Sequence, residues 1–142
     1  MYQFTRLFQL RRKMMQILML RINPIKFALY GIKLGKQPRI CNHVYLHVHP
    51  KSSVTIGDSF TMTSGENFNP LCRNIKGTIY AEREGTVIKI GNHVGMSSTC
   101  LWAKREIIID DHVNIGGDCI IMDSDAHNLD WHVRDSGEMF DA

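Results

Sequence analysis

The spacing of hydrophobic residues along this chain changes once, near residue 40. Between residues 4 and 30, apolar side chains recur at three- and four-residue steps, which is the period of an amphipathic helix. Pro24 and Gly31 interrupt the pattern, so it predicts one helix to about Ile22 and a short second helix after Pro24. From about Ile40 onward, short apolar stretches alternate with Gly, Asn, Asp and Ser, which predicts many brief strands separated by turns.

A six-residue period organises this second region. Three stretches, starting at Ile56, Ile90 and Ile109, share a pattern of Ile, Gly or Asp, Asp or Asn, a polar residue and an apolar residue. A flat sheet would show period two and a helix 3.6, whereas a six-residue period indicates a β-helix in which three units make one turn. We therefore expect the apolar residues at the first position of each unit to face the core: Ile56, Ile90, Ile109, Ile115 and Ile121.

Two irregular intervals interrupt this period. Ile56 and Ile90 are 34 residues apart, two short of two full turns, so we expect an outward loop within residues 64–85. Ile90 and Ile109 are 19 residues apart, which predicts one inserted residue near residues 104–107. The same register predicts that Trp102 follows Ile90 as an inward-facing residue.

The repeat breaks down at the segment Asp123-Ser124-Asp125-Ala126-His127, where a polar side chain takes the place of an apolar one and an irregular stretch follows. The repeats and this D-x-D-x-H segment resemble the hexapeptide-repeat O-acetyltransferases, which include maltose, sugar, capsule and lipopolysaccharide acetyltransferases. The resemblance covers about residues 40–142. It implies a mainly β fold, a left-handed parallel β-helix over residues 37–142, with a basic amphipathic helical segment over residues 1–36.

The same resemblance implies an acetyl-CoA-dependent transfer of an acyl group to a hydroxyl of a sugar, in a surface polysaccharide or its precursor. His127 would be the general base and Asp125 the residue that orients its ring. Asp123 and Ser97 would line the site, although a plain corner of the turn is the preferred interpretation of Ser97 and Ser98. Further candidates for substrate contact are Trp131 and Arg134, for which packing against a neighbouring subunit is the alternative.

The family also implies a homotrimer with active sites between subunits. Its members normally continue beyond the catalytic loop into further turns that bind acetyl-CoA, and these turns are not found before Ala142. We therefore expect a truncated chain, a naturally short inactive paralogue or a fragment that needs a partner, and the acetyl-CoA-binding residues stay unassigned. The alternatives are an inactive β-helix scaffold or, on the spacing of His93, His127 and His132, a zinc-dependent trimer similar to carbonic anhydrases.

Charge is distributed unevenly. Residues 1–57 carry ten Lys or Arg and no acid, whereas the remaining residues carry seven basic and fourteen acidic side chains. Such asymmetry suggests an anionic partner, for which we expect peripheral contact with the inner face of the cell membrane rather than nucleic acid. The alternative is that the apolar stripe packs on the β-helix. The apolar run Met14–Leu20 is too short to span a bilayer, and we expect a cytoplasmic protein.

The remaining chemistry-bearing residues have simpler interpretations. None of the four cysteines forms a C-x-x-C pair, and Cys100 and Cys119 recur one turn apart, which predicts small core residues rather than nucleophiles. His93 and His112 occupy equivalent outward positions, so we expect them to stack on one face. We expect no bound metal.

Overall fold

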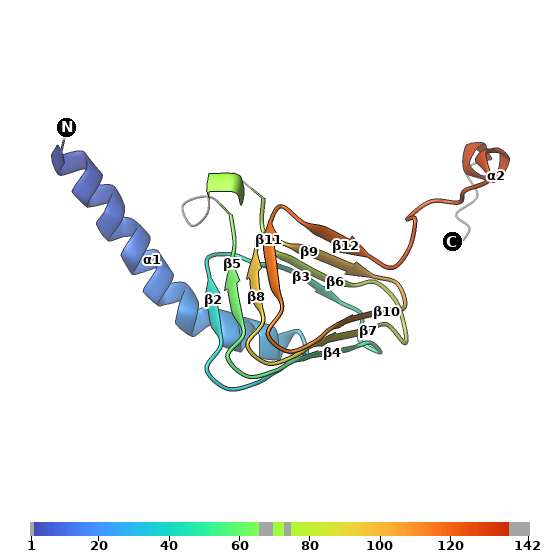
Figure 1. Ribbon diagram of the computed structural model, residues 1–142, viewed down its shortest axis with the longest axis horizontal. Helices are drawn as coiled ribbons and strands as arrows, with labels where there is room; N and C mark the ends of the chain where they lie inside the picture. The colour runs from blue at the N-terminus through green and yellow to red at the C-terminus, as the bar shows by residue number, and fades with distance from the viewer. Residues whose placement is uncertain (1, 66–69, 73–74, 137–142) are drawn as a thin grey trace.

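A computed structural model describes residues 2–65, 70–72 and 75–136 of the chain. The structure is mainly β, with three parallel sheets of four strands each and one long N-terminal helix, α1 (Tyr2–Leu29). Figure 1 shows the three sheets enclosing one core, with α1 leaving on one side and the short helix α2 (Trp131–Asp135) on the other.

Consecutive strands belong to different sheets, and each of the first nine strands pairs in parallel with the strand three places later. The first sheet contains β1 (Lys33–Leu34), β4 (Ser53–Ile56), β7 (Val87–Ile90) and β10 (Glu106–Ile109). The second contains β2 (Arg39–Cys41), β5 (Thr61–Thr63), β8 (Gly95–Ser97) and β11 (Asn114–Gly117). The third contains β3 (Tyr45–Val48), β6 (Thr78–Ala81), β9 (Cys100–Ala103) and β12 (Ile120–Met122). The first turn of the chain is therefore β1–β3, and the last is β10–β12.

The core is built from alternate residues of these strands, because successive side chains of a strand point to opposite faces. Ile56, Ile90 and Ile109 are buried as expected, with 4%, 2% and 7% of their surface exposed. Ile115 and Ile121 are partly buried and pack against the same core. The six-residue period therefore predicted correctly that these five isoleucines face the core.

The interval between Ile56 and Ile90 is one turn and not two, because Ile56 pairs directly with Ile90 across β4 and β7. The extra length lies in the connection from β5 to β6, which includes a 3₁₀ turn, η1 (Pro70–Cys72), and which the structure describes only in part. A second correction concerns Trp102. Leu101 is fully buried in its place, because the step from Met96 to Leu101 is one residue shorter than the period.

One corner of the turns is held by a ladder of side-chain oxygens. Asp58, Asn92 and Asp111 each accept a hydrogen bond from the backbone N–H one turn earlier. The donors are Lys36, Asp58 and Asn92, at 2.7, 2.9 and 2.6 Å. These bonds explain the recurring Asp or Asn, since the corner backbone cannot satisfy all its donors through the sheets. At the adjacent outward positions, the rings of His93 and His112 stack 4.9 Å apart, as expected.

The N-terminal helix is a single element and not two, and it continues through Pro24. Proline removes one backbone donor and disfavours a helix interior. Tertiary contacts on both sides of Pro24 oppose that effect: Met19, Asn23 and Phe27 are 6%, 1% and 0% exposed. The helix ends at Leu29 and β1 begins at Lys33, so the first strand lies within the segment 1–36 that was expected to be helical.

Candidate functional site

The segment that follows β12 begins with Asp123. The Asp123 carboxylate accepts hydrogen bonds from the backbone between β9 and β10, one turn earlier in the chain. Its two oxygens accept hydrogen bonds from the N–H groups of Lys104, Arg105 and Glu106, at 2.8, 2.6 and 2.7 Å. Burial raises the pKa of Asp123, but these N–H groups lower it by more, so its pKa lies below the usual value. Asp123 therefore anchors the segment, and its oxygens are engaged with backbone rather than presented to a substrate.

His127 and Asp125 lie just beyond this anchor, and both are exposed. Within the described part of the chain, neither side chain makes a hydrogen bond to the other or to a third residue. Ala126, between them, has a left-handed backbone with φ 64°, so the chain turns sharply here. The Ser124 hydroxyl is buried and has no hydrogen-bond partner among the described residues. The segment therefore combines an exposed imidazole with a buried hydroxyl that has no partner among the described residues.

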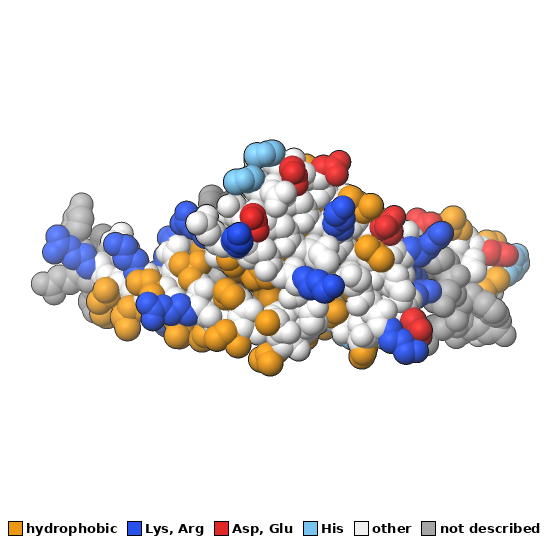
Figure 2. All heavy atoms as spheres, turned by 90° about the horizontal axis from the view of Figure 1, so that it is seen from below, with side chains coloured by type: hydrophobic (Ala, Val, Ile, Leu, Met, Phe, Trp, Pro, Cys, Tyr) orange, Lys and Arg blue, Asp and Glu red, His pale blue; other side chains and the backbone are white. Residues whose placement is uncertain are grey.

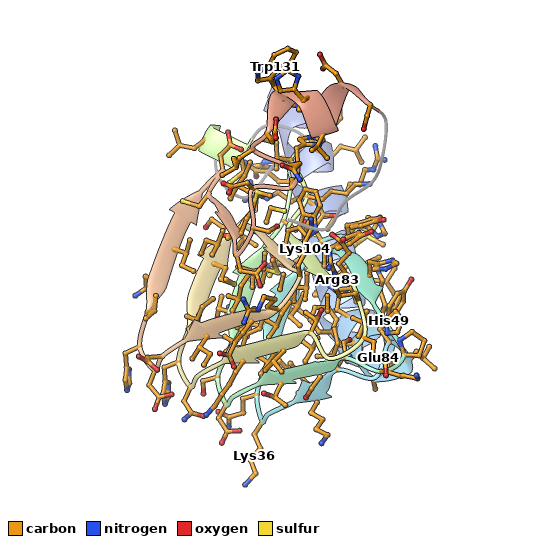
Figure 3. The ribbon with its side chains drawn as sticks, turned by 90° about the vertical axis from the view of Figure 1, so that its right-hand side faces the viewer. Lys36, His49, Arg83, Glu84, Lys104 and Trp131 are labelled. Atoms are coloured by element: carbon orange, nitrogen blue, oxygen red, sulfur yellow. The ribbon has the colours of Figure 1, made fainter. Side chains whose placement is uncertain are left out.

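Helix α2 follows and carries the two predicted substrate contacts. Asp130 caps its N-terminus by accepting a hydrogen bond from the His132 N–H at 3.0 Å. Trp131 is 64% exposed, its ring lies 3.5 Å from the ring of His132, and Arg134 is also exposed. No residue of α2 is buried. Figure 3 shows Trp131, the first residue of this helix, away from the strands.

Ser97 lies in the second sheet, whereas the segment that carries His127 follows β12 of the third sheet. It is the last residue of β8, and its hydroxyl oxygen accepts a hydrogen bond from the Thr63 hydroxyl at 3.1 Å. Ser98 is buried at the following corner with φ 44°, and its hydroxyl accepts the Gly65 N–H at 2.9 Å. Both serines hold successive turns together, which agrees with their interpretation as a plain corner.

An outward-facing row of aromatic residues crosses the third sheet and was missed by the sequence reasoning. His47, Tyr80 and Trp102 are direct cross-strand partners on β3, β6 and β9. The rings of His47 and Tyr80 stack 4.3 Å apart, and Trp102 meets Tyr80 edge-on at 5.9 Å. The Trp102 indole N–H donates to the Glu82 carboxylate. Because other strands lie between these three in sequence, and the long β5–β6 connection also lies between β3 and β6, only the pairing register reveals the row.

The other candidate groups are the remaining histidines and the cysteines. The described residues contain no cluster of three or more His, Cys, Asp or Glu side chains placed to hold a metal ion. The His93 ring stacks on the His112 ring, whereas the His132 ring lies tilted against the Trp131 ring, so these two histidines of the zinc alternative have different neighbours. Cys100 and Cys119 are half-buried rather than core residues, a correction to their predicted place. Burial raises the pKa of the Cys100 thiol, which disfavours its nucleophilic thiolate.

A hollow of about 420 Å³ lies where α1 ends, beside the connection from β3 to β4. None of the predicted site residues lines it, and its walls combine apolar side chains with one histidine and one serine. The lining residues are Leu29, Tyr30, Gly31, Val48, His49, Pro50 and Ser52.

Comparisons with family models, with curated proteins and with solved structures found no match to this chain. The resemblance to hexapeptide-repeat acetyltransferases therefore rests on the residues quoted above. The strand topology supports it only at the level of three parallel sheets wound around one core.

Proposed function

We propose that the strands form a left-handed parallel β-helix of hexapeptide repeats and that the chain is an acetyl-CoA-dependent O-acetyltransferase acting on a sugar hydroxyl. Six-residue steps between inward residues of neighbouring sheets support this fold, as from Ile109 to Ile115 and on to Ile121. The observation that carries the function is the D-x-D-x-H segment at the end of β12. There Asp123 fixes the backbone, and His127 is exposed two residues beyond Asp125.

The proposed reaction needs one general base. The neutral imidazole of His127 takes the proton of the acceptor hydroxyl while the hydroxyl oxygen bonds to the thioester carbonyl carbon. The carbon–sulfur bond then breaks, and the leaving coenzyme A thiolate takes the proton back from the imidazolium. Asp125, two residues away, is proposed as a positioning residue that holds the ring once substrate is bound.

The exposed residues of α2 supply the proposed contacts to the acceptor. The face of Trp131 suits stacking against a sugar ring, and the Arg134 guanidinium suits an anionic group on a polysaccharide or its precursor. Asp123 and Ser97 have no part in this proposal, since hydrogen bonds to the Lys104 N–H and the Thr63 hydroxyl already engage them.

The test is release of the coenzyme A thiol from acetyl-CoA in the presence of a panel of sugars. Acceptors with free hydroxyls should accelerate thiol release, whereas the same sugars with every hydroxyl methylated should not. If no acceptor accelerates release and calorimetry detects no acetyl-CoA binding, the alternative of a non-catalytic scaffold replaces this proposal. Light scattering tests the implied homotrimer, for which we expect three times the chain mass of 16.3 kDa.

A further inference from the structure

Helix α1 has two halves with different surroundings. Near its C-terminus, Asn23 and Phe27 are buried against the first turn of strands, and the Asn23 amide donates to the Ile40 and Asn42 carbonyls at 2.8 and 2.9 Å. The Lys26 ammonium donates to the Val44 carbonyl at 2.5 Å. The N-terminal half extends away from the strands, as Figure 1 shows. These contacts hold the C-terminal half of the helix to the body of the protein.

The apolar face of α1 points away from the strands. At about 100° per residue, Met19, Asn23 and Phe27 define one side of the helix, and most of the large apolar side chains fall on the opposite side. This geometry contradicts the alternative that the apolar stripe packs on the strands. The exposed apolar residues of the helix are Leu7, Phe8, Leu10, Met14, Met15, Ile17, Leu18, Ile22, Ile25 and Leu29, each at least 40% exposed.

The charges on α1 all have the same sign. The helix contains no Asp or Glu, and the first acid of the chain is Asp58. On the helical wheel, Arg11 and Arg21 fall within the apolar arc, and Arg6 and Lys13 lie beside it. Figure 2 shows hydrophobic and basic side chains side by side along this helix. The six basic residues are Arg6, Arg11, Arg12, Lys13, Arg21 and Lys26.

We propose that α1 lies in the headgroup region of an anionic lipid membrane, with its apolar face toward the acyl chains. Interfacial helices bind through burial of an apolar face together with attraction of their cations to anionic lipids, and α1 exposes both an apolar arc and cations. The long stems of Arg11 and Arg21 let their guanidinium groups reach lipid phosphates while the helix stays embedded. No helix within the described residues is both long and apolar enough to cross a bilayer, and α1 is proposed to lie along the surface.

The positive charge of α1 favours an anionic membrane over a second copy of the chain as the partner of its apolar face. Pairing two α1 helices along their apolar faces would bring Arg11 and Arg21 of both copies together, and like charges repel at that distance. An anionic lipid surface covers the apolar side chains and neutralises the same cations. The inference rests on α1 alone and not on acetyl transfer, so the two proposals can fail separately.

The experiment is co-sedimentation of the full chain with vesicles of phosphatidylcholine alone or with about one third phosphatidylserine. We expect at least tenfold stronger binding to the anionic vesicles at low salt, since each cation near such a surface contributes about 1 kcal/mol, or about fivefold. High salt should reduce the difference. Binding to neither vesicle, or equal binding to both, would overturn the proposal.

Two sets of variants test the two components of the surface. Leu7→Gln with Met14→Gln should lower binding to anionic vesicles at least tenfold, because two exposed apolar side chains are removed from the embedded face. The matched control is Ile108→Gln with Leu129→Gln, which removes two exposed apolar side chains elsewhere and should bind normally. Arg6→Gln with Arg11→Gln and Lys13→Gln should reduce the preference for phosphatidylserine at least tenfold, since three of the six cations of α1 are removed.

Circular dichroism melts of each variant establish that the fold is retained, as expected for substitutions at exposed positions. Binding that is lost equally in the control pair would show that α1 is not the docking surface. A dimer that dissociates in the Leu7→Gln, Met14→Gln variant, without any vesicle binding by the wild type, would assign the apolar face to a second copy and overturn the membrane proposal.

Discussion

The two ends of the strand stack differ in how they are closed. At the first turn, α1 covers the core, so that Ile40 and Leu46 are 1% and 5% exposed and Phe27 is fully buried beneath them. At the last turn, the inward residues Ile115 and Ile121 are only partly buried. Strands β10, β11 and β12 stand at the edges of their sheets in the described structure.

The residues expected to stabilise the fold and the residues proposed for catalysis lie at opposite ends of the strand stack. At the closed end, the buried ring of Phe27 covers the core, and Asn23 and Lys26 donate hydrogen bonds to backbone carbonyls. None of the proposed catalytic or acceptor-binding residues lies at this end. At the open end, the Asp123 carboxylate holds the segment that then presents Asp125 and His127 to solvent. Substitutions at the closed end should therefore change the free energy of unfolding, whereas exposed residues of the open end should change turnover.

The largest expected effect on stability is at Phe27. Phe27→Ala should lower the free energy of unfolding by about 3–5 kcal/mol, because a fully buried ring leaves a cavity at the junction of α1 and the strands. The control on the same helix is Phe8→Ala, which removes a ring that is 64% exposed and should change stability little. Chemical denaturation of both variants measures the difference, and equal losses would show that α1 does not close this end.

The next largest effect on stability is expected at the corner where Asp58, Asn92 and Asp111 accept backbone hydrogen bonds. A Cβ at Gly57 would lie 2.7 Å from the carbonyl group of Gly91 one turn away, too close for any carbon atom, so Gly57→Ala should cost about 1–3 kcal/mol. Gly116→Ala is its control in the last turn, since a Cβ there meets no atom within 4 Å. Thermal melts should separate the two variants. Indistinguishable melting temperatures would mean that the turns are not stacked as closely as described.

A smaller effect is expected at the anchor of the open end. Asp123→Ala should destabilise the fold by about 1–2 kcal/mol, because three backbone N–H groups lose their acceptor but lie near enough to water to recover part of the loss. Asp125→Ala removes an exposed carboxylate without a hydrogen bond in the described structure and should leave stability unchanged. Urea denaturation compares them, and a result in which both variants match the wild type would remove the anchoring role of Asp123.

The Asp123 anchor also predicts a pH dependence. Because folding lowers the pKa of Asp123, its stabilising contribution is fully present above the unfolded value of 3.8 and is lost as pH falls through the lower folded value. The difference in stability between wild type and Asp123→Ala should therefore be constant at neutral pH and shrink below about pH 4. Denaturation series at several acid pH values measure it, and a difference that grows toward acid pH would contradict the hydrogen bonds described.

The sequence predicted the mainly β architecture and the inward isoleucines because a six-residue period is long and repeated. It misjudged the interval from Ile56 to Ile90, since a long connection can be mistaken for a further turn when only spacing is considered. It also split α1 at Pro24, because the buried contacts of Asn23 and Phe27 that outweigh the proline penalty are tertiary and have no local signature.

The position of the candidate site in the sequence was predictable, but the separate roles of its residues were not. The motif located Asp123, Asp125 and His127 together, yet sequence alone does not distinguish a carboxylate that binds backbone from one that faces solvent. The row of His47, Tyr80 and Trp102 was hidden for a different reason. Its members become neighbours only through the pairing of β3 with β6 and of β6 with β9, strands that are not adjacent in sequence.

The most direct test of the central claim is the turnover of His127→Ala with acetyl-CoA and the best acceptor from the sugar panel. We predict a turnover about 10²–10⁴ lower than the wild type, with unchanged melting temperature and acetyl-CoA affinity, since the imidazole acts on the acceptor hydroxyl. His43→Ala, which removes an exposed histidine at the other end of the stack, should retain normal turnover. Near-normal turnover of His127→Ala would contradict the assignment of His127 as the general base.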